Sequence, residues 1–395
     1  MSMSTALQFS RSAGRQQRLA IDPVIVATVL GLLLVGLVMV TSASLTVSER
    51  NGVEPFFYFQ RQFLSVLLGG TIAAGVLATP IAAWKRFAPY LLIASFALLV
   101  VVLVPGIGHE VNGSRRWIRL GPLNLQPSEL ARWLLVTYMA IFAVRHQTEL
   151  RSSAHGFRKP LAVLAAAAAL LLVEPDFGAA VVLCITGTAV LFVAGARMRD
   201  FLVVCGVGAA GVAALAVISP YRLKRILAFL DPWSDPFDSG FQLTQSLIAV
   251  GRGEWFGVGL GSSIQKLFYL PEAHTDFVFA VLAEEFGLVG VLAVVIGFLV
   301  LVLRSLRLSR LAADAGMPLH ACIAAGFGVW IGLQAFLNIG VNMGLLPTKG
   351  LTLPLLSYGR SSMLVTLAWI GMLLRVHHEV AASGKSALPP EGRVK

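Results

Sequence analysis

The sequence contains little charge and little cysteine for its length. Only 13% of its 395 residues are Asp, Glu, Lys or Arg, whereas 57% are hydrophobic and the mean hydropathy is +0.80. Soluble domains carry about 25% charged residues, so an ordinary water-soluble fold is excluded. The short alternating strands of a membrane β-barrel are also missing, because the apolar residues come in long runs. The chain is therefore predicted to cross a lipid bilayer as helices.

The cysteines and the basic residues exclude two further classes of protein. Cys184, Cys205 and Cys322 stand singly within apolar runs, which predicts neither a disulfide framework nor a metal cluster. They are interpreted as small core side chains. The formal net charge of +11 is spread between the apolar runs and forms no dense basic domain, so no nucleic-acid partner is predicted.

Long apolar runs predict the fold class. A hydrocarbon core of about 30 Å needs roughly 20 apolar residues per helix, which predicts an all-α polytopic integral membrane protein with about ten transmembrane helices. The first run follows Arg11, Arg15 and Arg18 and has no small-residue cleavage site, so it is interpreted as an uncleaved helix. The predicted spans are 24–43, 62–79, 88–104, 129–144, 160–173, 177–195, 201–218, 276–303, 319–341 and 355–375.

An even number of spans puts both ends of the chain on one side of the membrane. A modest excess of Lys and Arg in alternate connections predicts that the N and C termini are cytoplasmic. The expected organisation is a cytoplasmic N-terminal segment (1–23), a membrane domain (24–375) and a cytoplasmic, disordered tail (376–395). Within the membrane domain, residues 219–275 are predicted to form a large extracytoplasmic loop between the seventh and eighth helices.

This loop contains two short helical patterns and a glycine-rich stretch. Apolar residues between 223 and 230 recur at helical spacing with cations among them, which predicts an interfacial helix, and 241–250 predicts a second one. Five glycines follow between Gly251 and Gly261. No strand precedes them and no Gly-Lys-Ser/Thr follows, so close backbone packing or a mobile lid is favoured over a nucleotide-binding loop.

The outer loops also contain cations that topology does not explain. Guanidinium groups suit phosphate oxygens, and a phosphate at the outer membrane surface is typical of a lipid carrier. Contact with ordinary phospholipid headgroups remains the alternative. The cations are Arg115, Arg116, Arg119, Arg222, Lys224, Arg225, Arg252, Lys266, Lys349 and Arg360.

The stretch from Tyr269 to Phe277 places His274 and Asp276 where a polar loop enters a membrane helix, and ionisable groups at such a position are costly. Asp276 has two interpretations: a general base, or an N-cap of the helix. Helical rise puts Glu284 about 12 Å deeper, too far for a paired carboxylate mechanism. A single base acting while a good leaving group departs is favoured. For His274 a loop hydrogen bond competes with a functional role.

Further polar clusters interrupt the apolar pattern. Ser128 and Glu129 follow a proline, which is typical of a helix start, and the i, i+3 spacing of Glu129 and Arg132 predicts an ion pair. In the last cluster, irregular backbone at membrane depth must line protein or a cavity. The clusters lie at 112–118, 125–132, 174–177 and 346–362.

Together the clusters resemble the SEDS family of polytopic membrane proteins, named for shape, elongation, division and sporulation. Residues 240–246, 270–276 and 346–354 look more like its division members than its elongation members. The resemblance rests on Asn112-Gly113-Ser114 to Trp117, Gln126-Pro127-Ser128-Glu129, Pro175-Asp176-Phe177-Gly178, Asp231-Pro232-Trp233, Asp235-Pro236-Phe237, Leu270 to Phe277, Ala283-Glu284-Glu285 and Pro354 to Gly359.

The resemblance implies an inverting peptidoglycan glycosyltransferase that polymerises lipid II at the outer face of the cytoplasmic membrane during septal cell-wall synthesis. The family's essential aspartate falls on Asp276, which becomes the expected general base. Undecaprenyl pyrophosphate is the expected leaving group. The residues expected to bind substrate are Arg116, Trp117, Lys349, Arg360, His274 and Ser357, and those expected to support the site are Glu129, Arg132, Asp176 and Glu284.

The expected partners are lipid II, undecaprenyl-pyrophosphate-linked glycan, a class B penicillin-binding transpeptidase and other divisome proteins. No resident metal is predicted, and a divalent cation (Mg or Mn) assisting pyrophosphate departure is left open. A lipid II flippase lined by Glu284 and Glu285 is the main rival, and a non-catalytic divisome scaffold is the second. The chain departs from the family pattern at Glu174, where Gln is common, and at Arg360, where Gly is common.

Overall fold

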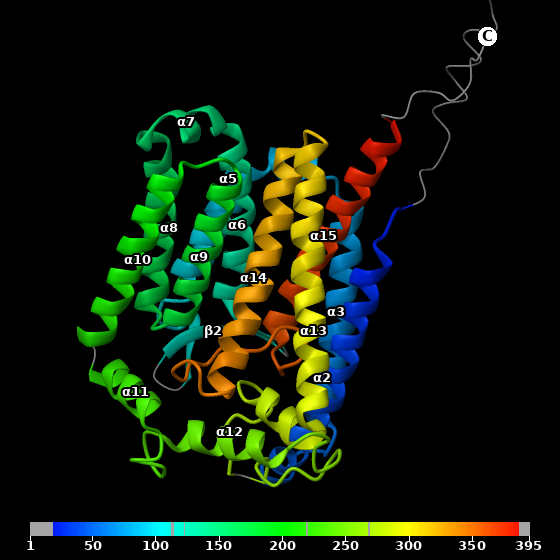
Figure 1. The fold of residues 1–395 in the computed structure, drawn as a ribbon, viewed down its shortest axis with the longest axis vertical. Coiled ribbons are helices and arrows are strands. Elements are labelled where there is room, and N and C mark those ends of the chain that lie inside the picture. The colour runs from blue at the N-terminus through cyan, green and yellow to red at the C-terminus, as the bar shows by residue number, and fades with distance from the viewer. Residues whose placement is uncertain (1–18, 112–113, 122, 219, 268, 387–395) are drawn as a thin grey trace, which may run out of the picture.

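A computed structural model describes residues 19–386 except 112, 113, 122, 219 and 268, and it is mostly helical. The long helices run side by side as a bundle along the longest axis of the molecule (Figure 1). The helices are α2 (Pro23–Arg50), α3 (Phe57–Ala78), α4 (Ile81–Arg86), α5 (Ala88–Val101), α6 (Pro127–Arg145), α7 (Gln147–Ser152), α8 (Ala154–Val173), α9 (Phe177–Val193), α10 (Met198–Ile218), α11 (Pro220–Leu230), α12 (Phe241–Arg252), α13 (Val278–Asp314), α14 (Pro318–Asn342) and α15 (Arg360–Ser386). The strands are β1 (Gly108–Val111), β2 (Ser114–Leu120) and β3 (Leu123–Leu125).

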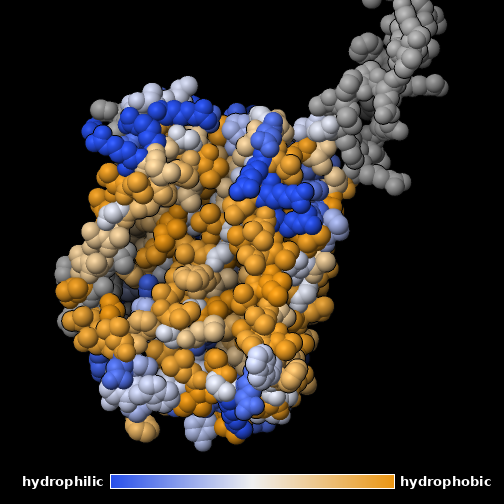
Figure 2. Space-filling model, viewed as in Figure 1, coloured by the Kyte–Doolittle hydropathy of each residue, from blue (hydrophilic) through white to orange (hydrophobic). Residues whose placement is uncertain are grey.

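Several of these helices have the dimensions of membrane spans. Among the described residues, five helices (α2, α3, α8, α13 and α14) are long and apolar enough to cross a bilayer, and α5 and α9 are shorter apolar helices. Each of the ten ranges predicted from the sequence overlaps a helix. The face drawn in Figure 2 has a hydrophobic middle and hydrophilic ends. The prediction of a helical, membrane-embedded bundle is therefore confirmed.

The expectation of an all-α fold is wrong in one place. Between α5 and α6 the chain forms a three-stranded antiparallel sheet in the order β1-β2-β3. Val111 pairs with Ser114 at the end of the β1–β2 ladder. The residues between them, Asn112-Gly113, lie outside the described part of the chain, but Asn-Gly is a strong hairpin signal in any sequence. The sequence analysis of cluster 112–118 considered its charged residues and did not use this turn signal.

The C-terminal boundary also needs correction. The predicted last span covered 355–375 and a disordered tail followed, but α15 begins at Arg360 and continues to Ser386. Contacts with α14 and α4 stabilise the extra turns. Glu379 accepts hydrogen bonds from His320 at 2.6 Å, from Arg375 at 2.6 Å and from the amide of Ile81 at 3.1 Å. Residues 387–395 of the predicted tail lie outside the described residues.

The helix starts follow from local capping chemistry. Asp22 accepts hydrogen bonds from the amides of Val24 and Ile25, with Pro23 in the first turn, and so fixes the start of α2. Asp176 likewise accepts from the amide of Ala179 at the start of α9. Within the bundle α3 packs along α15 and α13 along α14.

α13 is broken at one residue, and the glycine-rich stretch occupies the break. Gly287 has φ 63° and ψ −161°, a conformation that glycine adopts without steric cost. The amides of Val258 and Gly259 donate to the carbonyls of Glu284 and Glu285, and Leu288 donates to the carbonyl of Glu254. A Cβ on Gly257 would lie 2.1 Å from the Glu285 carbonyl oxygen. Close backbone packing, one of the two predicted roles for these glycines, is confirmed for Gly253 and Gly257, whereas Gly251 and Gly261 have no atom within 4 Å of an added Cβ.

Candidate active site

One end of the bundle gathers segments that are far apart in the sequence. β2, α11, α12 and the connection between α14 and α15 all lie at the lower end of the molecule in Figure 1, opposite α7. Asp276 lies in the turn that precedes α13, outside the membrane-spanning helix. The predicted site residues can therefore meet here although they come from four parts of the chain.

The main chain of Asp276 is fixed by two asparagines of α14. Asn338 Nδ2 and Asn342 Nδ2 donate to its carbonyl oxygen at 2.9 and 3.0 Å. Asn342 Oδ1 also accepts from the amide of Ala280 at 3.0 Å, which satisfies a free N–H in the first turn of α13. The N-cap position is Phe277, and no side chain caps it. The capping interpretation of Asp276 is thus wrong, and its carboxyl group is available for other work.

Burial and neighbouring charges set the ionisation of that carboxyl group. The pKa of Asp276 is raised to about 7, first by burial and then by the nearby Glu272 carboxylate, while the cations of Arg225 and Arg116 partly offset both effects. Gly350 lies against it, because a Cβ at that position would be 3.1 Å from Asp276 Oδ2. A carboxyl group that gains and loses a proton near neutral pH suits a general base.

Arg116 reaches the site because β2 is irregular. Trp117 pairs with His109 and Arg115 pairs with Glu110, so Arg116 is the extra residue of a β-bulge. A bulge changes the direction of a side chain, and here the guanidinium turns toward the α8–α9 connection. Its Nε donates to the Glu174 carbonyl at 3.0 Å and its Nη2 to the Pro175 carbonyl at 2.6 Å. These bonds hold a cation near Asp276, whereas Trp117 lies opposite His109 in the sheet.

A second and a third cation come from α11 and from the connection before α15. Arg225 Nη1 donates to the Thr348 carbonyl at 3.1 Å. The next residue, Lys349, extends over the ring of Phe177 with Nζ 4.6 Å from the ring centroid. Gly350 follows Lys349 and lies against the Asp276 carboxyl group. The segment 348–350 therefore places Arg225 and Lys349 in the neighbourhood of that carboxyl group. Arg225 lies in the site, although only its membership of the outer cations, and no substrate-binding role, was predicted from the sequence.

His274 lies beside Asp276 but in an aromatic cluster. Its ring packs against Tyr58 at 4.9 Å and Tyr358 at 5.6 Å, and its carbonyl accepts from the Tyr358 amide at 2.9 Å. Burial lowers the pKa of the imidazole, although Glu272 raises it. Arg360 lies near the Tyr358 phenol. Tyr358 therefore contacts His274 and lies within electrostatic reach of Arg360.

Ser357 is buried inside its own loop, with 3% of its surface exposed. Its hydroxyl accepts from the Leu353 amide at 2.8 Å, and its carbonyl accepts from Gln62 at 3.1 Å. These bonds shape the irregular backbone before α15, so we assign Ser357 to the loop and not to the substrate.

The predicted supporting residues form two groups. Asp176 caps α9 and also lies 3.3 Å from the Ser128 hydroxyl, which joins α9 to the start of α6. Glu129 and Arg132 form the predicted ion pair, with both side chains buried. These groups hold the elements that carry Arg116.

Glu284 has a different role from the one the flippase reading needs. It accepts from Ser263 at 2.5 Å and from Arg252 at 3.2 Å, and Glu285 accepts from Lys266 at 2.7 Å. Both carboxylates therefore bind the glycine-rich stretch to α13.

Glu174, the first departure from the family pattern, is buried, and neither of its carboxylate oxygens has a hydrogen-bond partner. The pKa of Glu174 is raised to about 8 by burial and by the Asp176 carboxylate, and the Arg116 cation opposes part of this shift. At neutral pH the side chain is thus protonated and resembles the glutamine that is common at this position in the family.

Glu174→Gln is expected to stabilise the protein at pH 8 and to leave it unchanged at pH 4. A pKa raised by folding costs stability as pH rises from the ordinary value of 4.5 toward 8, and glutamine removes that cost. Thermal unfolding of the purified protein at both pH values measures the difference. Glu110→Gln, which changes an exposed carboxylate on β1, serves as the control, and an equal response of both variants would contradict the explanation.

Sequence reasoning missed Arg225, Asn338, Asn342 and Gly350. The asparagines carried a usable signal, because two amides at i, i+4 in an apolar helix are costly in a membrane unless they have partners. Arg225 was recorded among the outer cations, but only its contact with Thr348 separates it from Lys224. Among the described residues, no group of three or more His, Cys, Asp or Glu side chains could hold a metal ion.

The bundle and this site define a polytopic membrane protein with a carboxyl group of raised pKa beside two arginines. Comparison with known proteins gives the family. A family model described as "Cell cycle protein", which covers FtsW, RodA and SpoVE, matches residues 23–382. The chain belongs to this FtsW/RodA/SpoVE family, as the resemblance in the sequence predicted.

Relatives cover almost the whole chain. The "Probable peptidoglycan glycosyltransferase FtsW" of Thioalkalivibrio sulfidiphilus is 54% identical over 382 residues, which is 96% of each chain. The protein of the same name from Coxiella burnetii is 49% identical over 91% of this chain and 96% of its own.

Two solved structures share the fold. One is described as "Structural coordination of polymerization and crosslinking by a peptidoglycan synthase complex", with a TM-score of 0.74, 32% identity and coverage of 92% of this chain and 99% of that one. The other is the Thermus thermophilus rod shape determining protein RodA, with a TM-score of 0.67, 31% identity and coverage of 92% and 98%.

Proposed function

We propose that this protein is a peptidoglycan glycosyltransferase that polymerises lipid II into glycan strands at the outer face of the cytoplasmic membrane, at the division septum. One observation carries the proposal: a half-buried carboxyl group, Asp276, lies within electrostatic reach of Arg116 and Arg225 at one end of a membrane bundle. The relatives named FtsW agree with it.

In the proposed mechanism Asp276 takes the proton of the acceptor, the 4-hydroxyl of the GlcNAc of lipid II. The hydroxyl oxygen forms a bond to the anomeric carbon of the growing glycan while the bond from that carbon to the undecaprenyl pyrophosphate breaks. The configuration inverts, and the pyrophosphate leaves with the bonding electron pair. Arg116, Arg225 and Lys349 neutralise the charge that develops on it. Asp276 thus acts on the attacking hydroxyl, and the cations act on the leaving pyrophosphate of the same displacement.

The proposed topology has ten spans, with both termini cytoplasmic and residues 219–275 outside. It is supported by the distribution of elements in Figure 1, where α11, α12 and β2 share one end of the bundle and α7 lies at the other. The position of the two ends of the described chain agrees with this topology. Ala20 hydrogen-bonds to His377 and His378 in the extension of α15, so both ends lie on the same side of the bundle. The site then faces the periplasm, where lipid II arrives with its sugars exposed.

The rival functions fit the contacts less well. A flippase would need Glu284 and Glu285 along a path, but their oxygens bind Arg252, Lys266 and the glycine-rich stretch. A scaffold would leave Asp276 as a helix cap, but Asn342 satisfies the free amide at the start of α13. The proposed partner, a class B penicillin-binding transpeptidase, is supported by the synthase-complex structure that shares this fold.

Reconstitution separates the three functions. The full chain in vesicles, with lipid II on the outer face, is expected to produce glycan ladders, and addition of the transpeptidase is expected to increase their yield. Scrambling of lipid II without ladders would identify a flippase. Neither activity, with the partner present, would leave a scaffold.

The polymerisation rate should depend on the ionisation of Asp276. A general base must be deprotonated, so the rate is expected to fall about tenfold per pH unit below the pKa of about 7 and to level off above it. Glu272→Gln removes a charge that raises this pKa, so the midpoint should move to lower pH. Initial rates between pH 5.5 and 8.5 measure both. A midpoint that stays in place in Glu272→Gln would show that another group titrates.

A further inference from the structure

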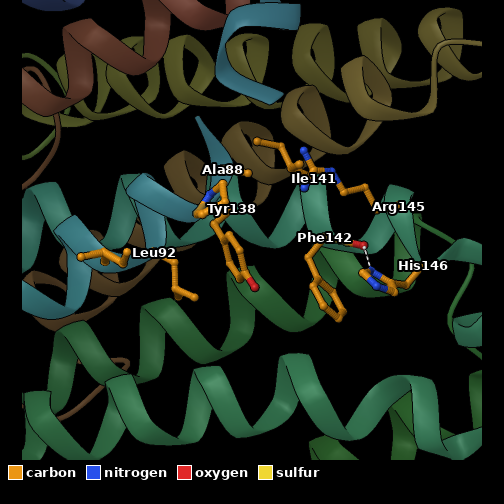
Figure 3. A pocket seen from close by; sticks show the side chains of 9 residues that line it. Ala88, Leu92, Tyr138, Ile141, Phe142, Arg145 and His146 are labelled. Carbon is orange, nitrogen blue, oxygen red and sulfur yellow. Dashed lines mark hydrogen bonds between the residues drawn. The ribbon is translucent and has the colours of Figure 1, made fainter. Parts of the chain in front are cut away.

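A cavity lies at the end of the bundle that is opposite Asp276. It has a volume of about 320 Å³ and opens between α5 and α6, close to α7. Its walls are apolar, and Figure 3 shows Leu92, Tyr138, Ile141 and Phe142 among the side chains around it. The volume is at the lower end of the roughly 300–1,000 Å³ of small-molecule sites. No step of the proposed polymerisation uses it.

One rim of the cavity is cationic. Two of the nine lining residues are basic: Arg145, the last residue of α6, and His146. None of the nine is a carboxylate. Arg145 Nη2 donates to the backbone carbonyl of Lys85 at 2.7 Å, which fixes the guanidinium against the segment that carries the exposed cations Lys85 and Arg86. An apolar slot therefore ends at a positioned guanidinium.

The imidazole of His146 is held in one orientation. Its Nδ1 donates to the Phe142 carbonyl at 3.1 Å, drawn as a dashed line in Figure 3, and its ring stacks on Phe142 with centroids 4.3 Å apart. This fixes the ring at the mouth of the cavity beside Arg145. The arrangement is a head-and-tail site, with apolar walls for a chain and the Arg145 guanidinium for a head.

We propose that this cavity binds an anionic glycerophospholipid of the cytoplasmic leaflet, with an acyl chain between α5 and α6 and its phosphate on Arg145. Charge complementarity selects this occupant. In the proposed topology this end of the bundle faces the cytoplasm, whose leaflet supplies anionic headgroups at the depth where α6 ends. A zwitterionic lipid would place a choline cation beside Arg145, and the guanidinium repels it.

The proposal is independent of the polymerase activity. It requires a phospholipid diester and not a free phosphate, because the cavity is lined by apolar groups and the cations lie only at its rim. Since each cation near a membrane surface contributes to binding of an anionic lipid, removal of one should weaken binding about fivefold.

Native mass spectrometry of the full chain in detergent tests the proposal. The protein is delipidated and titrated with phosphatidylglycerol or with phosphatidylcholine of the same acyl chains. Wild type is expected to retain phosphatidylglycerol at least about fivefold better. Arg145→Gln is expected to remove that preference and leave phosphatidylcholine retention unchanged, whereas Arg145→Lys keeps most of it.

Two further variants define the site. Arg310→Gln removes an exposed arginine from α13 on the same membrane side and should keep the preference. Leu92→Trp fills the cavity without changing charge and should reduce retention of the lipid. Equal losses in Arg145→Gln and Arg310→Gln would mean diffuse surface charge, and displacement of the lipid by inorganic phosphate alone would mean an anion site. Preferential retention of a polyprenyl phosphate would identify a different occupant; each of these results overturns the proposal.

Discussion

Asp276→Asn is expected to reduce the rate of lipid II polymerisation by about 10²- to 10⁴-fold, the range that a positioned general base contributes. Asparagine has nearly the same shape, and the carbonyl of residue 276 would still accept from Asn338 and Asn342. The loss would therefore belong to the carboxyl group. Glycan ladders from reconstituted wild type and variant measure it. Ladders of normal length and rate from Asp276→Asn would refute the assignment.

A stability measurement separates lost chemistry from lost folding. The pKa of Asp276 is raised by folding, so ionisation costs stability as pH rises from 3.8 toward 7, and the asparagine variant is free of that cost. Asp276→Asn should therefore be at least as stable as wild type at pH 8 while inactive. Asp238→Asn, which changes an exposed carboxylate paired with Lys224 on the same side, should keep its activity. A less stable Asp276→Asn at pH 8 would remove the physical basis of the raised pKa.

The helical part of the fold could be predicted because it depends on local composition. Runs of apolar residues specify a span regardless of what packs beside them. The sheet was less accessible, since β1 and β2 are short and amphipathic alternation is weak in a stretch as charged as Ser114 to Leu120. Its one clear signal was the Asn112-Gly113 turn. The break at Gly287 was beyond prediction, because it depends on hydrogen bonds to Gly253–Gly259 from another segment.

The site could be predicted in part for the same reason. Asp276 is conspicuous in the sequence, since a carboxylate at a membrane boundary is costly wherever its neighbours come from. Its capping alternative could not be rejected without Asn342, which lies 66 residues away along the chain. Ser357 and Arg116 looked equally plausible as ligands. Their local contacts separate them. The hydroxyl of Ser357 accepts a hydrogen bond within its own loop, whereas a β-bulge directs Arg116 toward the site.

Arg225→Gln is expected to lower polymerisation by about 10²- to 10³-fold, the usual effect of removing one donor that stabilises transition-state charge. Arg225 is one of two cations that act on Asp276, and its bond to Thr348 positions the segment that carries Lys349. Lys224, the adjacent residue of α11, provides the matched control because it pairs with Asp238 in solvent. Lys224→Gln should change the rate less than about twofold, since exposed ion pairs contribute little. Equal effects of the two variants would mean that α11 supplies diffuse positive charge.

The pH profile distinguishes a direct role of Arg225 from a loose loop. The guanidinium lowers the pKa of Asp276, so Arg225→Gln should move the midpoint of the rate profile to higher pH, opposite to Glu272→Gln. A variant that only released Thr348 would lower the rate at every pH without moving the midpoint. Arg225→Lys completes the comparison, because it keeps the charge and loses the planar fork that suits a pyrophosphate. A normal midpoint with a reduced plateau in Arg225→Lys is the result expected if the same arginine tunes the base and holds the leaving group.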